Sequence, residues 1–323
     1  MKMSRSAARS SVTVVLPTRN RADLLGRAIR SVLDQTHEHW ELVIVDDDST
    51  DGTDALVRSF TDRRIRYLRS EGSAGPSRAR NTGIRAAGPT EFLAFLDDDD
   101  EWLSRKLERQ LEVFQTSPLS PVAVGCGRID CGTDGEKVLL PHHRGFIFED
   151  LLARRARGYG APLVMVRRIP GEPDFVFDEE LPCLEDADYG MRIARNRAMD
   201  FVAEPLVKVY RDERREHAWN AEAALRGYDL LALKYADELA RRPWVRSYYA
   251  VCAARELSSL GRMAECRRRL RDAMPASESR ARLVAWYCGS LLGRVGQRVA
   301  ERLLPVAPPE TRFPAAAVGL MPV

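Results

Sequence analysis

The stretch Phe92-Leu93-Ala94-Phe95-Leu96-Asp97-Asp98-Asp99-Asp100-Glu101-Trp102 decides how this chain folds. Its five apolar residues predict a buried strand, and four aspartates follow at the point where that strand would emerge. Carboxylates this close repel one another, so a fold keeps them charged only where something positive neutralises them. Two interpretations are open at this point. One is a divalent cation on hard oxygen ligands; the other is a solvated acidic turn before a helix, whose N-terminus favours Asp and Glu.

Two earlier strands end in polar clusters in the same way. Residues 12–16 are apolar or Thr and lead into Pro17-Thr18-Arg19-Asn20, and residues 41–45 lead into Asp46-Asp47-Asp48-Ser49-Thr50-Asp51. Apolar residues between Leu24 and Leu33 recur at helical spacing, so strands and helices alternate. This alternation predicts a Rossmann-like α/β fold, a mostly parallel sheet flanked by helices. Ligands bind such sheets beyond the carboxyl ends of the strands, so we expect the three polar clusters to converge on one crevice.

The rest of the chain adds further strands and a helical C-terminal region. We predict strands near 65–68, 122–127, 161–166 and 200–209, and helices near 54–60, 79–87, 104–115 and 184–197, with Ser104 as a helix cap. Roughly the last hundred residues have helical periodicity, with a hairpin of two helices around Gly261. We expect a disordered tail over 1–11, an α/β domain over 12–215, a helical region over 216–304 and a Pro/Ala-rich tail over 305–323.

Composition and charge argue against several classes of protein. With 45% hydrophobic and 30% charged residues, the chain is ordinary for a soluble globular protein. Its basic excess is spread through helices without interleaved aromatic residues, which argues against nucleic-acid binding. Six cysteines without a CxxC pair argue against a zinc–thiolate site and fit reduced thiols in a cytosol. Residues 1–11 lack the apolar run of a signal peptide, and the apolar stretch 283–293 is too short to span a bilayer, so we expect a cytoplasmic protein.

Five motifs, in order and with matching spacing, resemble glycosyltransferase family 2, the inverting enzymes of the GT-A fold. They are Val12-Thr13-Val14-Val15-Leu16-Pro17-Thr18-Arg19-Asn20, Ile44-Val45-Asp46-Asp47-Asp48-Ser49-Thr50-Asp51-Gly52-Thr53, Ser77-Arg78-Ala79-Arg80-Asn81-Thr82-Gly83-Ile84, Phe95-Leu96-Asp97-Asp98-Asp99-Asp100 and Leu184-Glu185-Asp186-Ala187-Asp188-Tyr189. Together they cover about residues 11–212. The resemblance implies a GT-A catalytic domain followed by the helical region. It also implies a metal-dependent transfer of a hexose from a nucleotide-diphosphate sugar, with a UDP-sugar favoured.

The resemblance also implies which residues bind the donor. Asp47 would accept a hydrogen bond from the N3–H of a uracil-type base, for which a carboxylate is a strong acceptor; a capping turn with Ser49 and Asp51 is the structural alternative. Asp98 would reach the ribose, and Asp99 would hold Mn²⁺ or Mg²⁺ on the diphosphate, where the cation stabilises the leaving group. Arg80 would reach the diphosphate or else cover the surface of its helix. The donor-binding residues implied in this way are Pro17, Thr18, Arg19, Asn20, Asp47, Arg80, Asp97 and Asp98.

Glu185 and Asp186 match the acceptor-side acid pair of the family. Inversion by single displacement needs a carboxylate opposite the leaving group, placed to take the proton of the acceptor hydroxyl. By its position in the motif Asp186 is that base, and Glu185 lies on the acceptor side. Asp188 would orient or cap and not catalyse. The structural alternative is a negatively charged helix start. The implied acceptor is a hydroxyl of a glycan, a lipid-linked sugar or a small molecule.

Two other functional classes remain open. A nucleotidyltransferase acting on sugar phosphates would share such a sheet, but it would carry a glycine-rich phosphate loop after the first strand, and Pro17-Thr18-Arg19-Asn20 has no glycine. A non-catalytic protein that binds a nucleotide-sugar would have no reason to keep both the acidic cluster and Glu185-Asp186.

Residues 281–304 predict an amphipathic helix with Arg294, Arg298 and Arg302 along one stripe. Such a helix either lies on an anionic membrane surface or packs on the catalytic domain with its arginines in water. The first alternative would place the protein at the inner face of the membrane as a peripheral protein.

Overall fold

The computed structural model describes residues 10–133, 135–210, 220–273 and 287, in two compact units. The first unit comprises residues up to 152 and 156–235, and the second comprises 153–155 and the residues from 236 onward. Helix α8 (Ala221–Lys234) therefore belongs to the first unit. The predicted domain limits at 11, 215 and 304 stay predictions.

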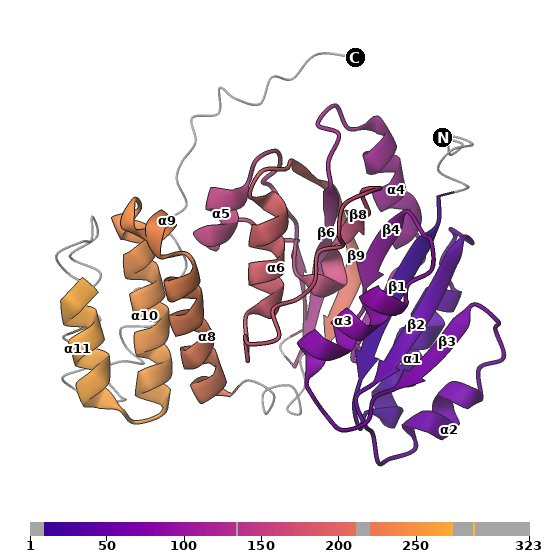
Figure 1. The fold of residues 1–323 in the computed structure, drawn as a ribbon, viewed down its shortest axis with the longest axis horizontal. Coiled ribbons are helices and arrows are strands. Elements are labelled where there is room, and N and C mark those ends of the chain that lie inside the picture. The colour runs from indigo at the N-terminus through magenta and orange to yellow at the C-terminus, as the bar shows by residue number, and fades with distance from the viewer. Residues whose placement is uncertain (1–9, 134, 211–219, 274–286, 288–323) are drawn as a thin grey trace. The chain divides into compact units, whose positions relative to one another are not determined.

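Nine strands of the described residues form one mixed sheet in the first unit (Figure 1). The order is β3-β2-β1-β4-β8-β6-β9-β5, and β7 pairs with β6. The pairs β3–β2, β2–β1, β1–β4 and β6–β9 are parallel, and the other four pairs are antiparallel. The strands are β1 (Val12–Thr18), β2 (Trp40–Asp46), β3 (Ile65–Arg69), β4 (Phe92–Phe95), β5 (Asp100–Trp102), β6 (Ala123–Gly132), β7 (Gly135–Leu139), β8 (Met165–Arg167) and β9 (Met199–Tyr210).

Helices cover both faces of this sheet. The helices of the first unit are α1 (Ala22–Leu33), α2 (Thr53–Arg58), α3 (Pro76–Ala86), α4 (Lys106–Thr116), α5 (Phe148–Leu152), α6 (Glu185–Ala194) and α8, with the 3₁₀ turn η2 (Ala161–Leu163). Successive strand side chains point to opposite faces. Val14 and Leu16 of β1 therefore join the core that includes Leu25 and Ile29 of α1, whereas α3 packs across β1 and β2 on the other face.

Helix α3 lies so close to β1 that Gly83 leaves no room for a side chain. A Cβ atom at Gly83 would stand 2.3 Å from Cγ1 of Val15. We expect Gly83→Ala to lower the free energy of unfolding by about 1–3 kcal/mol, because overpacking forces the backbone apart. Gly26→Ala in α1 is the matched control: its Cβ would meet only the flexible Arg30 side chain, at 3.4 Å, and alanine is the better helix former. Thermal unfolding of the two variants checks this, and equal losses of stability would contradict it.

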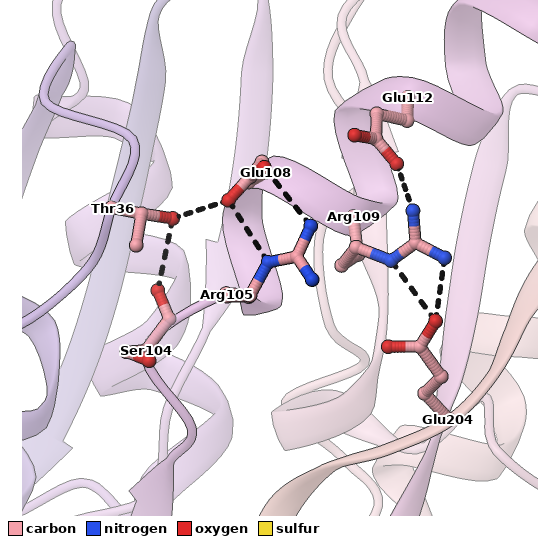
Figure 2. A network of polar contacts seen from close by, with 7 residues as sticks. All are labelled: Thr36, Ser104, Arg105, Glu108, Arg109, Glu112 and Glu204. Carbon is pink, nitrogen blue, oxygen red and sulfur yellow. Dashed lines mark hydrogen bonds and ion pairs between the residues drawn. The ribbon is translucent and has the colours of Figure 1, made fainter. Parts of the chain in front are cut away.

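Helix α4 begins later than predicted. It starts at Lys106 with Arg105 at the N-cap position, so Ser104 does not cap it. The Ser104 carbonyl instead accepts a hydrogen bond from the Thr36 backbone N–H at 2.9 Å. Thr36 Oγ1 also donates to Glu108 Oε2 at 2.7 Å, and Arg105 pairs with the same carboxylate (Figure 2). Farther along the helix Arg109 pairs with Glu112 and Glu204.

A lysine is buried in the core beneath β5. Lys106 is inaccessible to solvent, its Nζ donates to Gln110 Oε1 at 2.9 Å, and it lies 3.9 Å from the centre of the Trp102 ring. Gln110 Nε2 donates in turn to the carbonyls of Val124 and Leu163, at 2.7 and 2.8 Å. Burial disfavours the ammonium charge and lowers the pKa of Lys106 to about 8.

Because of the buried lysine, the stability of the folded protein should change with pH in the alkaline range. The unfolded chain holds this proton up to the ordinary pKa of 10.5, whereas the folded protein releases it near pH 8. Between these values the unfolded state binds more protons, so the folded state gains stability as pH rises. We expect the melting temperature of the unchanged protein, relative to that of Lys106→Met, to rise between about pH 7 and pH 10. Lys137→Met, at an exposed position of β7, is the control. A difference that stays constant over this pH range would contradict the prediction.

The strand predicted at 161–166 is also different in the structure. Residues 161–163 form η2, and only Met165–Arg167 pair as β8. Pro162 has no backbone N–H to give to a ladder, which is why the chain turns before it pairs.

The second unit is helical, as predicted. It contains α9 (Ala236–Ala240), α10 (Pro243–Ser259) and α11 (Met263–Ala273). Gly261 has φ +78 between the last two, a backbone conformation that favours glycine, so the predicted hairpin is confirmed. The amphipathic segment 281–304 lies outside the described residues except for residue 287, as do 1–9 and 305–323 of the predicted tails. None of the helices described here is long and apolar enough to cross a membrane.

Candidate active site

A cleft of about 900 Å³ opens where β1, β2 and β4 end and α6 begins. The three polar clusters predicted from the sequence converge there, because parallel strands end at the same edge of a sheet. The predicted site residues that line it are Pro17, Thr18, Arg19, Asp47, Arg80, Asp97, Asp98, Asp99, Glu185 and Asp186. Asn20 is not among the lining residues.

The end of β1 is tied to the acidic run after β4. The buried Thr18 donates from Oγ1 to Asp98 Oδ2 at 2.8 Å. Arg21 places Nη1 2.6 Å from Asp99 Oδ2 and 3.7 Å from Asp98 Oδ1. Burial raises the pKa of Asp98 to about 7; Arg21 opposes this shift and the neighbouring Asp99 adds to it. One guanidinium therefore faces two carboxylates here.

A second arginine fixes the backbone of this acidic run. Arg27 Nη2 donates to the carbonyl oxygen of Asp99 at 2.7 Å, and its guanidinium stacks 3.7 Å from the centre of the Tyr210 ring. The Tyr210 hydroxyl donates to Glu101 Oε2 at 2.6 Å. Arg27 of α1 thus holds the Asp99 backbone, and Tyr210 of β9, tied to Glu101 of β5, holds Arg27 in turn.

Asp46, the last residue of β2, and Asp47, which follows it, have different surroundings. Asp46 is inaccessible to solvent and accepts hydrogen bonds from the Ser49 N–H, at 2.8 Å, and from the Tyr67 hydroxyl, so it braces the turn. Asp47 faces the cleft. Its carboxylate accepts from Ser73 Oγ at 2.8 Å and from the N–H groups of Ala74 and Gly75, both at 2.9 Å.

The capping turn weighed for Asp47 is made by Asp51 instead. Asp51 Oδ1 accepts from the Thr53 N–H at the start of α2, and Oδ2 accepts from the Ala22 N–H at the start of α1, both at 3.0 Å. Asn20, at φ +52, links the same two loops: its N–H donates to Ser49 Oγ at 2.9 Å and its Oδ1 accepts from the Thr50 N–H at 2.7 Å.

Arg80 is a buried bridge between the two acidic regions. Its Nη2 donates to Asp97 Oδ1 at 2.7 Å and its Nη1 donates to Glu185 Oε1 at 3.0 Å. Burial disfavours the charge, but Asp97 and Glu185 outweigh it and hold the pKa of Arg80 above its ordinary value. Arg80 is therefore buried and paired with two carboxylates and does not cover the surface of its helix; its contact with a diphosphate stays a prediction.

Helix α6 starts from a strained residue at the edge of the cleft. Leu184 at the N-cap has φ +66, which is rare for a residue with a branched side chain. It directs Glu185 and Asp186 into the cleft, where Asp186 Oδ2 lies so near Gly160 that a Cβ there would be 3.0 Å away. Burial raises the pKa of Glu185; Arg80 opposes this shift and Asp186 adds to it.

Asp188, two residues on, is structural. It is inaccessible to solvent and accepts from Arg192 Nε at 2.7 Å and from the Tyr235 hydroxyl at 2.9 Å, with Lys234 Nζ also 2.9 Å away. This agrees with the expectation that Asp188 orients the helix.

The sequence prediction missed two arginines that line the cleft. Arg21 directly follows the Pro17–Asn20 turn, so extending that motif by one residue would have included it. Arg128 lies on β6, which pairs with β8 and β9 far along the chain, and the sequence gives no sign that this strand reaches the cleft.

The carboxylates suit a cation that shares its ligands with a substrate. Across the described ranges, no three His, Cys, Asp or Glu residues gather as a complete metal site. Mg²⁺ is usually held by one or two carboxylates together with substrate phosphates, and Asp98 and Asp99 provide such oxygens at the cleft. The donor set therefore fits a divalent cation that binds together with a phosphate-bearing ligand.

Comparison with known proteins matches the first half of the chain to one family. Residues 13–168 match the family described as "Glycosyl transferase family 2". The chain is 40% identical over 109 residues to UDP-Glc:alpha-D-GlcNAc-diphosphoundecaprenol beta-1,3-glucosyltransferase WfgD of Escherichia coli, which is 34% of this chain and 43% of the relative. It is 45% identical over 104 residues to the putative teichuronic acid biosynthesis glycosyltransferase TuaG of Bacillus subtilis, 31% of this chain and 40% of the relative. The chain thus spans about two fifths of the length of these relatives.

Solved structures match over most of the chain. Staphylococcus aureus TarS 1–349, in complex with UDP-GlcNAc, superposes with a TM-score of 0.66 at 18% identity over 90% of both chains. The mannosyltransferase PcManGT of Pyrobaculum calidifontis, in complex with GDP-Man and Mn²⁺, gives 0.56 at 18% identity over 92% of this chain and 88% of that one. The predicted fold class, a mostly parallel GT-A sheet flanked by helices and followed by a helical region, is confirmed. Residues 13–168 of this chain belong to glycosyltransferase family 2.

Proposed function

We propose that this protein is an inverting, metal-dependent glycosyltransferase that moves a hexose from a UDP-sugar to a hydroxyl group. One observation carries the proposal: the ends of β1, β2 and β4 and the start of α6 line a single cleft of about 900 Å³. Its volume is in the range of small-molecule sites. In this proposal Asp47 would bind the base, Asp98 would reach the ribose and Asp99 would hold a cation on the diphosphate. Glu185 and Asp186 would lie on the acceptor side.

Asp47 is suited to select the base. Two carboxylate oxygens offer about four acceptor positions, and Ser73, Ala74 and Gly75 fill three of them. The remaining position can accept one N–H, such as that on N3 of uracil. The three donors also hold the carboxylate in one orientation, so little ordering is left to be done on binding. A base without an N–H at that position would leave a buried acceptor unpaired.

Asp99 would hold Mn²⁺ or Mg²⁺, and Asp98 beside it would reach the ribose. When bound, the cation would stabilise the negative charge that the diphosphate gains on leaving. Arg27 contributes by fixing the Asp99 backbone. Pro17, Thr18 and Arg19 also line the cleft and would bind the donor. Thr18 keeps Asp98 in place through its hydroxyl hydrogen bond.

Asp186 would act as the base. It lines the cleft, and no hydrogen bond or ion pair to its carboxylate is found within the residues that the structure describes. Glu185, in contrast, is held by Arg80. The acceptor hydroxyl would give its proton to Asp186 while its oxygen attacks the anomeric carbon from the side opposite the diphosphate. One such displacement inverts the configuration.

The acceptor would lie on the α6 side of the cleft, which Gly160, Pro162 and Leu163 also line. A glycan or a lipid-linked sugar is the acceptor class that we propose, because WfgD is named for transfer to a diphosphoundecaprenol-linked sugar. A cytoplasmic location, with peripheral membrane contact, stays a prediction.

A thermal-shift panel tests the donor proposal. UDP, GDP, dTDP and CDP are added to the full-length protein with and without Mn²⁺. We expect UDP with Mn²⁺ to raise the melting temperature most, because binding to the native state alone stabilises it. CDP, whose ring lacks the N3–H, should raise it least. Equal shifts for all four, or none with Mn²⁺, would contradict the proposal. Inversion is then checked by the anomeric configuration of the product.

A further inference from the structure

Arg21 binds at the position where a donor-bound cation would need to bind. Its Nη1 is 2.6 Å from Asp99 Oδ2 and 3.7 Å from Asp98 Oδ1. The two carboxylates are 10% and 12% exposed and the arginine 29% exposed, so the pair is shielded from bulk water on the acidic side and open on the other. A guanidinium–carboxylate contact this short is a charge-assisted hydrogen bond.

The acidic run is also held in place by residues other than Arg21. The Asp99 backbone is held by Arg27, and Asp98 is held by Thr18. Arg21 itself lies just before α1, and its carbonyl oxygen, not its side chain, accepts the first helical hydrogen bonds from Leu24 and Leu25. Removing the Arg21 side chain would therefore leave the Asp99 backbone, the Asp98 carboxylate and the helix start held by their other contacts.

A divalent cation and the Arg21 guanidinium would compete for the same oxygen of Asp99. When a cation binds that oxygen, Arg21 loses its ion-pair partner. The diphosphate of a bound donor would then be the anion with which Arg21 pairs. Arg21 is better placed for this than Arg80, because the Arg21 side chain is 29% exposed and the Arg80 side chain only 7%. The guanidinium fork suits two phosphate oxygens as well as it suits a carboxylate.

We infer that Arg21 is a counter-ion that exchanges partners. It pairs with Asp99 in the empty cleft and with the diphosphate once cation and donor are bound. This inference rests on the proposed function and extends it to a residue outside the predicted site. Its consequence is thermodynamic: cation alone must displace Arg21 without compensation, whereas cation with UDP gives Arg21 a new partner. Mn²⁺ and UDP then strengthen each other's binding by one common factor, which depends on Arg21.

The test measures Mn²⁺ affinity directly, by the electron paramagnetic resonance signal of free Mn²⁺, with and without saturating UDP. In the unchanged protein we expect UDP to tighten Mn²⁺ binding strongly. In Arg21→Gln, Mn²⁺ without UDP should bind roughly three- to tenfold more tightly, because the competing charge-assisted hydrogen bond is gone. UDP should bind more weakly to this variant, and the tightening by UDP should shrink by a similar factor.

Two further variants make the outcome specific. Arg19→Gln removes another positive charge from the wall of the cleft, so it measures the effect of charge alone and should change Mn²⁺ affinity less. Arg21→Lys keeps the charge but not the forked guanidinium. Its Mn²⁺ affinity without UDP should therefore lie between those of Arg19→Gln and Arg21→Gln. If Arg21→Gln binds Mn²⁺ without UDP no more tightly than Arg19→Gln, the inference is wrong while the proposed function stands. If the unchanged protein binds no UDP in the presence of Mn²⁺, both are wrong.

Discussion

Asp186→Asn is expected to lower the turnover number for sugar transfer by at least about a hundredfold and to leave UDP binding with Mn²⁺ nearly unchanged. The amide has the size of the carboxylate but cannot take the proton of the acceptor hydroxyl, and a positioned base contributes about 10² to 10⁴ in rate. The substitution disrupts little else, because no hydrogen bond or ion pair to Asp186 is found in the part of the chain that the structure describes. Turnover is followed by UDP release, and binding by thermal shift.

Asp188→Asn is the matched control, two residues along the same helix. It replaces a buried carboxylate that pairs with Arg192, Lys234 and Tyr235. We expect it to lower the melting temperature, because the cations around it lose their partner in the core. At temperatures where it is folded it should keep its activity. Asp186→Asn should show the reverse pattern. Near-normal turnover in Asp186→Asn would show that the base has been assigned to the wrong residue.

The convergence of the site was predictable because a parallel sheet leaves few choices. Once residues 12–16, 41–45 and 92–96 are recognised as parallel strands, the polar residues after each must meet at one edge, and the cleft contains Thr18, Asp47 and Asp99 as expected. The helical hairpin around Gly261 was predictable for a similar reason: periodicity and one glycine specify it locally.

Pairings between distant side chains were not predictable. Arg80 joins Asp97 to Glu185, which lies 105 residues after Arg80, and this pairing depends on how α3 and α6 pack over the sheet. That Arg128 reaches the cleft depends on the crossed order β8-β6-β9, which no local pattern encodes. Asp46 and Asp47 are adjacent residues of the same type, so the sequence alone does not distinguish their roles. Only the pleat of β2 decides that one is buried against Tyr67 and the other faces the cleft.

Asp99→Asn is expected to remove at least about 99.9% of the transfer activity, because a cation on the diphosphate is worth several kcal/mol of transition-state stabilisation. The variant should also bind UDP equally well with and without Mn²⁺, since the amide oxygen is a far weaker ligand than a carboxylate. The measurements are the rate of transfer and the dissociation constant of UDP at zero and saturating Mn²⁺.

Asp97→Asn separates this effect from a general loss of charge in the acidic run. Asp97 pairs with the buried Arg80, not with Arg21, so its amide should cost stability while UDP binding still responds to Mn²⁺. The comparison is sharp because the two residues are two apart and both line the cleft. If Asp99→Asn kept a Mn²⁺-dependent affinity for UDP and Asp97→Asn lost it, the cation would have to be assigned to the first aspartate of the run. Arg80, which that carboxylate now neutralises, would then need a different partner.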